Sequence, residues 1–94
     1  MVFDWDEKKN AINLRKHGVE FDEAALVFED PFQLLLFDCF VENEARWKTI
    51  GSVGNVVLLL VVHTLEDDEG EEFVRIISAR QASGYERRLY EESI

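Results

Sequence analysis

The spacing of hydrophobic and polar residues changes along the chain, from a helical period near the start to long apolar runs later. Phe3 and Trp5 alternate with acidic residues, which predicts a short first strand or an extended entry. A helix is predicted over residues 7–16, because Asp6 can cap its first turn and Gly18 can end it.

A second helix is predicted over residues 22–29. Its apolar residues recur at helical spacing and indicate a core segment: Phe21, Ala24, Ala25 and Phe28. Asp22 can cap this helix. The helix should end at Asp30, because Pro31 disfavours the helical conformation in the residue before it.

Four later segments are typical of strands: 32–40, 46–52, 55–64 and 73–79. A hairpin turn is predicted at residues 52–55, and the acidic run at 66–72 predicts a solvated turn. Short links imply antiparallel pairing, with 56–62 next to 73–79 and the latter in an inner or near-inner position. Ser83 and Glu86 have capping-box spacing and predict a last helix to about residue 92. The chain should therefore form one α+β domain over residues 1–94. Two N-terminal helices pack on an antiparallel sheet of three to four strands, and a C-terminal helix follows.

Composition agrees with a folded domain, since 47% of the residues are hydrophobic. Cys39 is the single cysteine, which excludes an internal disulfide; in its apolar segment an inert, buried thiol is expected. The acidic start differs from a signal peptide, and the apolar run 56–62 is too short to span a bilayer. We therefore expect a soluble, cytoplasmic protein that has no contact with a membrane.

The net charge of −10 disfavours loose electrostatic binding to nucleic acid, so an anion site must be local. Four of the ten basic residues lie on one arc of the first helix: Lys8, Lys9, Arg15 and Lys16. The arc is either a contact surface for RNA or a solvated face whose last bases complement the helix dipole.

The segment 73–80 holds the main candidates for an anion site. Arg75 lies inside an apolar strand and Arg80 at its end, and each guanidinium needs solvent or an anionic partner. They would bind phosphate from a rigid strand; the alternative is that they reach solvent or pair with a structural carboxylate. Alternation alone puts them on opposite faces, so convergence requires a twist or bulge after Ile77.

Familiar catalytic motifs are missing: no metal site, no cofactor loop and no nucleophile elbow is predicted. What remains is cleavage of RNA through its own 2′-hydroxyl, which needs an acid, a base and cations on the phosphate. His17 or His63 would titrate in the useful range, although His63 ends an apolar strand, where a packed neutral histidine is more common. Trp47 beside Arg46 would stack on a base, or it belongs to the sheet core.

Several motifs occur in an order that resembles a known family. The opening reads Phe3-x-Trp5-Asp6-x-x-Lys9-Asn10-x-x-Asn13-Leu14-x-Lys16-His17-Gly18-Val19-x-Phe21-x-Glu23-Ala24. Arg46-Trp47-x-x-Ile50-Gly51 follows, and then come residues 75–80 and 86–90. Over nearly the whole chain these motifs resemble the BrnT toxin family.

The resemblance implies a metal-independent endoribonuclease with a RelE-like fold, which inhibits translation as the toxin of a type II toxin–antitoxin pair. It implies a BrnA-like antitoxin that neutralises the toxin, contact with DNA only through that antitoxin, and a homo-oligomer or a heterotetramer with the antitoxin. Matched positions suggest a catalytic set: Lys16, His17, Arg75 and Arg80. The expected RNA-binding residues are Lys8, Lys9, Arg15, Arg46 and Trp47.

Two departures from the family pattern keep a second hypothesis open. Residues 81–85 stand where the family continues with basic residues, and the stretch before Phe73 is longer and more acidic. Both changes weaken the attraction for RNA. The alternative is a non-catalytic module that binds an antitoxin and tunes transcription.

Overall fold

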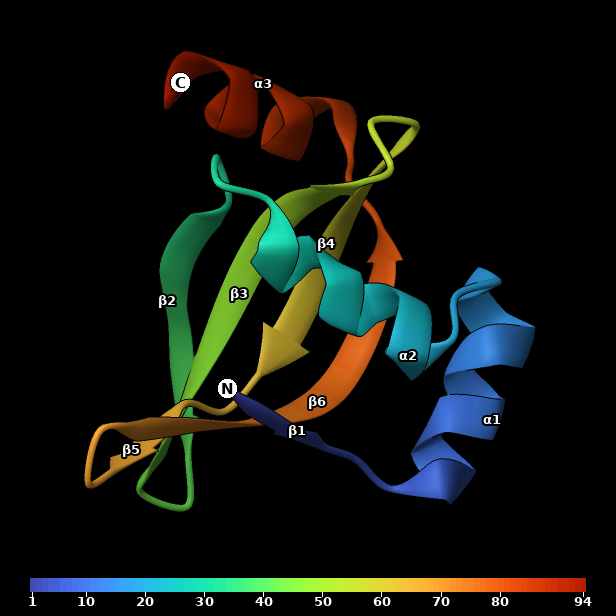
Figure 1. Ribbon diagram of the computed structural model, residues 1–94. Coiled ribbons are helices and arrows are strands. Elements are labelled where there is room, and N and C mark those ends of the chain that lie inside the picture. Colours follow the sequence, from blue (N-terminus) through green and yellow to red (C-terminus); the bar gives the residue numbers. More distant parts are fainter.

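The computed structural model describes all 94 residues, and Figure 1 shows its elements. In chain order they are β1 (Val2–Asp4), α1 (Glu7–His17), α2 (Phe21–Ala24), the 3-10 helix η1 (Ala25–Glu29), β2 (Leu34–Val41), β3 (Glu44–Val53), β4 (Val57–His63), β5 (Glu66–Asp68), β6 (Glu71–Gln81) and α3 (Gly84–Glu92). None of the helices has the length and apolar content that a membrane crossing requires.

Helix α1 begins and ends where its capping residues predict. Asp6 Oδ1 accepts hydrogen bonds from the backbone N–H groups of Lys8 and Lys9, at 2.8 and 3.4 Å. Gly18 follows the helix with a φ of 72°, and its N–H donates to Leu14 O at 2.8 Å. These bonds satisfy backbone groups that a helix end otherwise leaves unpaired.

The second predicted helix is divided into two parts. α2 is about one α-helical turn, and η1 continues it as a tighter helix that ends before Asp30 and Pro31. η1 packs directly on β3, because a Cβ atom built at Gly51 would lie 2.8 Å from Val27 Cβ and 2.9 Å from Val27 O. Glycine at position 51 therefore sets how closely the helical layer approaches the sheet.

The sheet is larger than predicted and is not purely antiparallel. Six strands take part, in the order β1-β6-β4-β3-β2, with β5 paired to β6 beside this path. β1 pairs with β6 in parallel, and Asp4 lies opposite Arg75. The expectation of three to four antiparallel strands is therefore wrong.

The two strands added to the predicted sheet are short, and neither has an apolar pattern that reveals its partner. The sequence predicts β1 as a short strand or an extended entry but does not predict its pairing, and it does not predict β5 as a strand. β1 has three residues, and it pairs with a segment near the other end of the chain. β5 contains only acidic residues and pairs antiparallel with β6. It forms because Glu69 and Gly70 both take positive φ and close a tight hairpin, while the carboxylates stay exposed.

The central pairings agree with the prediction. β4 pairs antiparallel with β6, and β6 lies between β4 and β1 in the sheet. The hairpin from β3 to β4 turns at Gly54 and Asn55, which both have positive φ.

The helices lie on the two faces of the sheet unequally (Figure 1). α1, α2 and η1 lie at one face, which we call the helix-covered face. Its buried cluster is Val19, Phe21, Ala24, Val27, Leu59, Val61, Val74, Ile76 and Ala79. The opposite face, which we call the open face, is covered at one end by α3. Its smaller cluster is Ile50, Leu58, Leu60 and Tyr90.

Asn13 attaches α1 to the edge of β6. Its amide group donates to Ala79 O at 2.8 Å and accepts from Ala79 N at 3.1 Å, as a neighbouring strand would. It also donates to Val19 O at 2.9 Å, and Asn10 Oδ1 accepts from Phe21 N at 2.8 Å. The two asparagines of the opening motif are thus structural, since they satisfy buried backbone groups.

Asp30 connects three elements at the far end of the sheet. Its carboxylate accepts hydrogen bonds from Tyr90 Oη of α3 at 2.6 Å, from Ser52 N of β3 at 2.8 Å and from Phe32 N at 2.9 Å. Burial acts to raise the pKa of Asp30, but these three bonds outweigh it and lower the pKa below its usual value. Asp30 therefore anchors α3 against the open face.

Candidate active site

The open face carries basic side chains that come from two strands. Strand register places Arg80 and Ile50 on either side of Leu60, and Ser78 and Lys48 on either side of Val62. By alternation, the open face receives Arg46, Lys48 and Arg80, and α3 leaves the part around Val62 uncovered.

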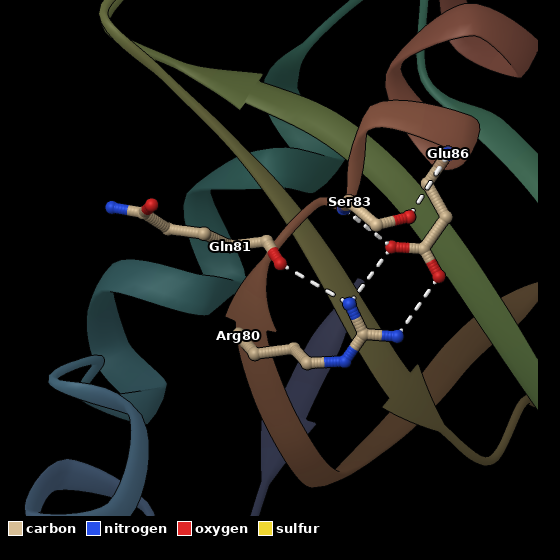
Figure 2. A network of polar contacts seen from close by, with 4 residues as sticks. All are labelled: Arg80, Gln81, Ser83 and Glu86. Carbon is tan, nitrogen blue, oxygen red and sulfur yellow. Dashed lines mark hydrogen bonds and ion pairs between the residues drawn. The ribbon is translucent and has the colours of Figure 1, made fainter.

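Arg80 at the end of β6 is held by a carboxylate from α3 (Figure 2). Its Nη1 donates to Glu86 Oε1 and its Nη2 donates to Glu86 Oε2, both at 2.8 Å. Nη1 also donates to the backbone oxygen of Gln81 at 3.2 Å. The guanidinium is therefore fixed by a two-point ion pair, the strongest form of this interaction.

Glu86 is itself fixed by the start of α3. Its Oε1 accepts from Ser83 N at 2.8 Å, and Ser83 Oγ accepts from Glu86 N at 3.2 Å, which completes the predicted capping box (Figure 2). The hydrogen bonds from Arg80, with smaller contributions from Ser83, outweigh burial and lower the pKa of Glu86 to about 2. The carboxylate is thus ionised throughout the physiological pH range.

Arg75 lies on the same side of β6 as Arg80 because the strand contains a bulge. Ile76 pairs with His63 and Ser78 with Val62, so Ile77 is an extra residue between them. The structure therefore has the bulge that convergence of the two arginines requires. The two guanidiniums share no partner, however, because Arg80 pairs with Glu86 and Arg75 with Asp4.

The surroundings of Arg75 are more acidic than those expected of a phosphate site. Its Nη2 lies 3.6 Å from Asp4 Oδ2, and both side chains are about two-thirds exposed, at 66% and 69%. Arg75 lines a cavity of about 340 Å³ together with Asp4, Glu44 and Glu66. It also lines a second cavity, of about 300 Å³, together with Lys9. The structure thus brings Arg75 and Lys9 together, among carboxylates.

The other candidates on α1 lie apart from Arg80. Lys8, Arg15 and Lys16 are exposed, and none of them forms an ion pair. His17 is half-buried and follows Asn13 by four residues, so it lies on the side of α1 that faces β6. No polar contact connects His17 or Lys16 with either arginine.

Arg46 and Trp47 point to opposite faces of β3. Trp47 lies on the helix-covered side and packs edge-on against Phe37, with ring centroids 5.5 Å apart. Arg46 pairs with Glu44 at 3.1 Å, and its buried Nε has no hydrogen-bond partner. Trp47 therefore packs against another aromatic ring of the sheet, and its contact with RNA stays a prediction.

Two predictions about single residues have opposite outcomes. His63 is fully buried: Nδ1 donates to Thr64 O at 2.8 Å, which leaves Nε2 to accept from Thr49 Oγ1 at 2.7 Å. Burial lowers its pKa, so His63 is a neutral core residue, as the apolar strand predicts. The prediction of a buried thiol at Cys39 is wrong, because β2 is an edge strand and leaves this side chain exposed.

Sequence reasoning missed two polar residues of the open face. Lys48 lies two positions after Arg46, and alternation within one strand would have placed both on the same face. Its Nζ lies 3.6 Å from Asp38 Oδ1. Glu86 was assigned only to the capping box, and no local signal shows that its carboxylate also holds Arg80.

The fold and the open face define a class of protein: a small α+β domain that presents basic side chains on one face of its sheet. The family described as "Ribonuclease toxin, BrnT, of type II toxin-antitoxin system" matches residues 5–86. The chain therefore belongs to the BrnT family of ribonuclease toxins, and this type of system implies an antitoxin as partner.

A solved structure supports the fold. The crystal structure of the Brucella abortus ribonuclease toxin BrnT, at 1.1 Å resolution, superposes with a TM-score of 0.59 and 23% sequence identity. The match covers 88% of this chain and 99% of the Brucella chain. At this identity the likeness concerns the fold alone. No curated protein matches the chain.

Proposed function

We propose that this protein is a metal-independent endoribonuclease toxin that inhibits translation. The observation that carries the proposal is the guanidinium of Arg80, which Glu86 holds in one orientation at the end of a strand, with 40% of the arginine side chain exposed. A fixed cation beside an open, partly basic sheet face suits the charge that develops on a phosphate during cleavage.

The proposed reaction uses the substrate's own nucleophile. The 2′-hydroxyl oxygen attacks the adjacent phosphorus, and the bond from phosphorus to the 5′-oxygen breaks. A base takes the 2′ proton and an acid protonates the leaving 5′-oxygen, so the products are a 2′,3′-cyclic phosphate and a 5′-hydroxyl. Arg80 would stabilise the phosphate, with Arg75 and Lys16 as further cations and His17 as the acid or base. Lys8, Lys9, Arg15 and Arg46 would contact the RNA backbone, and Trp47 would stack on a base.

The proposed partner is a BrnA-like antitoxin that covers Arg75 or Arg80 with its own carboxylates, because burying an arginine without a partner is costly. DNA would be contacted only through the antitoxin, in a heterotetramer or another oligomer, and the pair would act in the cytoplasm. A purified complex that leaves both arginines open to solvent would contradict direct occlusion.

The function is tested with purified protein and RNA in the presence of a metal chelator. We expect cleavage that leaves a 2′,3′-cyclic phosphate, and a loss of about a hundredfold in rate for Arg80→Ala and for Arg75→Ala. Arg88→Ala is the matched control, because Arg88 is exposed on α3 and forms no ion pair. Wild-type rates in the double variant would reject the site, and a requirement for magnesium would reject the mechanism.

The acidic cavity around Arg75 favours a second candidate function, a non-catalytic module that binds an antitoxin and tunes transcription. The two candidates differ in cells. An active toxin stops growth and degrades RNA when it is induced without its neighbouring gene, whereas a binding module leaves both unchanged.

A further inference from the structure

The hydrogen bonds of Arg80 leave one edge of its guanidinium without a partner. An arginine has five N–H donors in a planar fork. Nη1 uses its two hydrogens on Glu86 Oε1 and Gln81 O, and Nη2 uses one on Glu86 Oε2. The second Nη2 hydrogen and the Nε hydrogen make no hydrogen bond within the protein. These two N–H groups are parallel, and together they form a second two-point donor for an anion.

We propose that Glu86 is a positioning residue, which holds Arg80 so that its Nε and Nη2 hydrogens bind two oxygens of one RNA phosphate. This inference rests on the proposed ribonuclease function and assigns a separate role within it. Glu86 occupies the end of the guanidinium and leaves the side edge open, so the ion pair orients the arginine without blocking it.

The contacts of Glu86 differ from those of a simple surface ion pair and fit a positioning role. The Glu86 side chain is only 15% exposed, and Ser83 N fixes one of its oxygens independently of Arg80. Arg80 extends from a strand that pairs with β4, so both partners have fixed backbones. An ion pair between exposed, flexible side chains lacks both the additional hydrogen bond and the low exposure, and it loses side-chain entropy when it forms.

The charge of the pair indicates which kinetic constant should respond. Glu86 neutralises Arg80, so the pair attracts an anion weakly from a distance. The rate enhancement comes from N–H donors that are already oriented toward the phosphate. Their stabilising effect is largest in the transition state. Loss of Glu86 should therefore lower kcat without raising KM.

Glu86→Gln tests this role while the helix start is kept. Glutamine serves in a capping box as glutamate does, so one amide oxygen can still accept from Ser83 N. The amide NH₂ cannot accept from Arg80, and one of the two bonds that orient the guanidinium is lost. We expect kcat to fall about tenfold or more with KM unchanged or lower. The melting temperature should fall as well, because the ionised carboxylate also stabilises the folded protein.

Ser83→Ala is the matched control, because it should lower stability without lowering kcat. It removes the hydroxyl that accepts from Glu86 N and leaves both bonds between Arg80 and Glu86 in place. This variant should melt earlier and keep the wild-type kcat. A higher kcat in Glu86→Gln would show that Glu86 masks Arg80, and an equal fall of kcat in both variants would reduce its role to helix capping. Either result would overturn the inference.

A binding measurement separates this inference from the proposed function. Inorganic phosphate titrated into wild-type protein should shift the Nε–H NMR signal of Arg80, and Glu86→Gln should reduce that shift. A shift in a protein that cleaves no RNA would overturn the proposed function and support the phosphate edge. An active protein whose Arg80 signal ignores phosphate would overturn the edge alone.

Discussion

At the scale of single residues, hydrogen bonds to charged side chains fix the geometry of the candidate site. Arg80 could be identified from the sequence, because an arginine at the end of an apolar strand needs a partner. Its partner could not, since Glu86 satisfies a capping pattern that already explains its position. The same limit applies to Asp30, whose place before a proline predicts a helix end but not its bond to Tyr90.

The ionisation of Glu86 makes stability depend on acid pH. Its folded pKa of about 2 lies below the ordinary value of 4.5, so its contribution is present above pH 4.5 and is lost as the pH falls toward 2. Urea unfolding of wild type and Glu86→Gln at several pH values measures this contribution. We expect the difference in unfolding free energy to shrink between pH 4.5 and 2; a constant difference would contradict the assignment.

The bond between Tyr90 and Asp30 makes stability depend on alkaline pH. Burial and Asp30 raise the pKa of Tyr90 to about 12, above its ordinary value of 10. The phenol's contribution is therefore complete below pH 10 and is lost as the pH rises from 10 to 12. Tyr90→Phe should lower the unfolding free energy at neutral pH by about 1–3 kcal/mol and remove this alkaline loss. Tyr85→Phe, at an exposed position, is the control.

Whole elements could be predicted where their signals are local. Caps identify both ends of α1, and the turn at residues 54 and 55 identifies the hairpin from β3 to β4. Long-range pairing gives no such signal, so the parallel contact of β1 with β6 could not be found. The bulge at Ile77 could be predicted only in part. Alternation shows that Arg75 and Arg80 need a bulge in order to share a face, but it does not show that one is present.

The docking of α1 depends on one side chain. Asn13→Ala removes three hydrogen bonds and leaves the buried N–H and C=O groups of Ala79 without them. An unsatisfied buried group costs about 1–3 kcal/mol, so we expect a loss of unfolding free energy of at least that size in urea titrations. Lys16→Ala, an exposed position on the same helix, should stay within about 0.5 kcal/mol of wild type. A neutral Asn13→Ala would contradict the anchoring role.

At the scale of the whole molecule, the charge opposes the proposed substrate. The net charge is −10, and six acidic residues belong to the hairpin of β5 and β6: Glu66, Asp67, Asp68, Glu69, Glu71 and Glu72. At low salt these negative charges repel RNA over long distances. At physiological ionic strength, screening limits the repulsion to about 8 Å.

We therefore expect that added salt, or the loss of acidic residues from this hairpin, does not raise the KM for RNA. Replacing Glu69 and Glu72 by glutamine should lower KM for RNA several-fold at low salt and change it little at about 0.5 M salt. The wild-type KM should stay flat or fall as salt rises to about 0.15 M. The steep rise that is usual for basic RNA-binding proteins would contradict this account.

The position of β6 in the chain has a consequence for synthesis. β1, β4 and β5 all pair with β6, and α1 bonds to its edge, yet β6 is the last strand to be made. β1 and β5 emerge earlier from the ribosome and have no strand partner until residues 71–81 follow, whereas β4 can already pair with β3. Glu86 comes later still, so a chain interrupted before that position carries Arg80 without its support. The protein thus acquires its proposed phosphate edge only after Glu86 has been made.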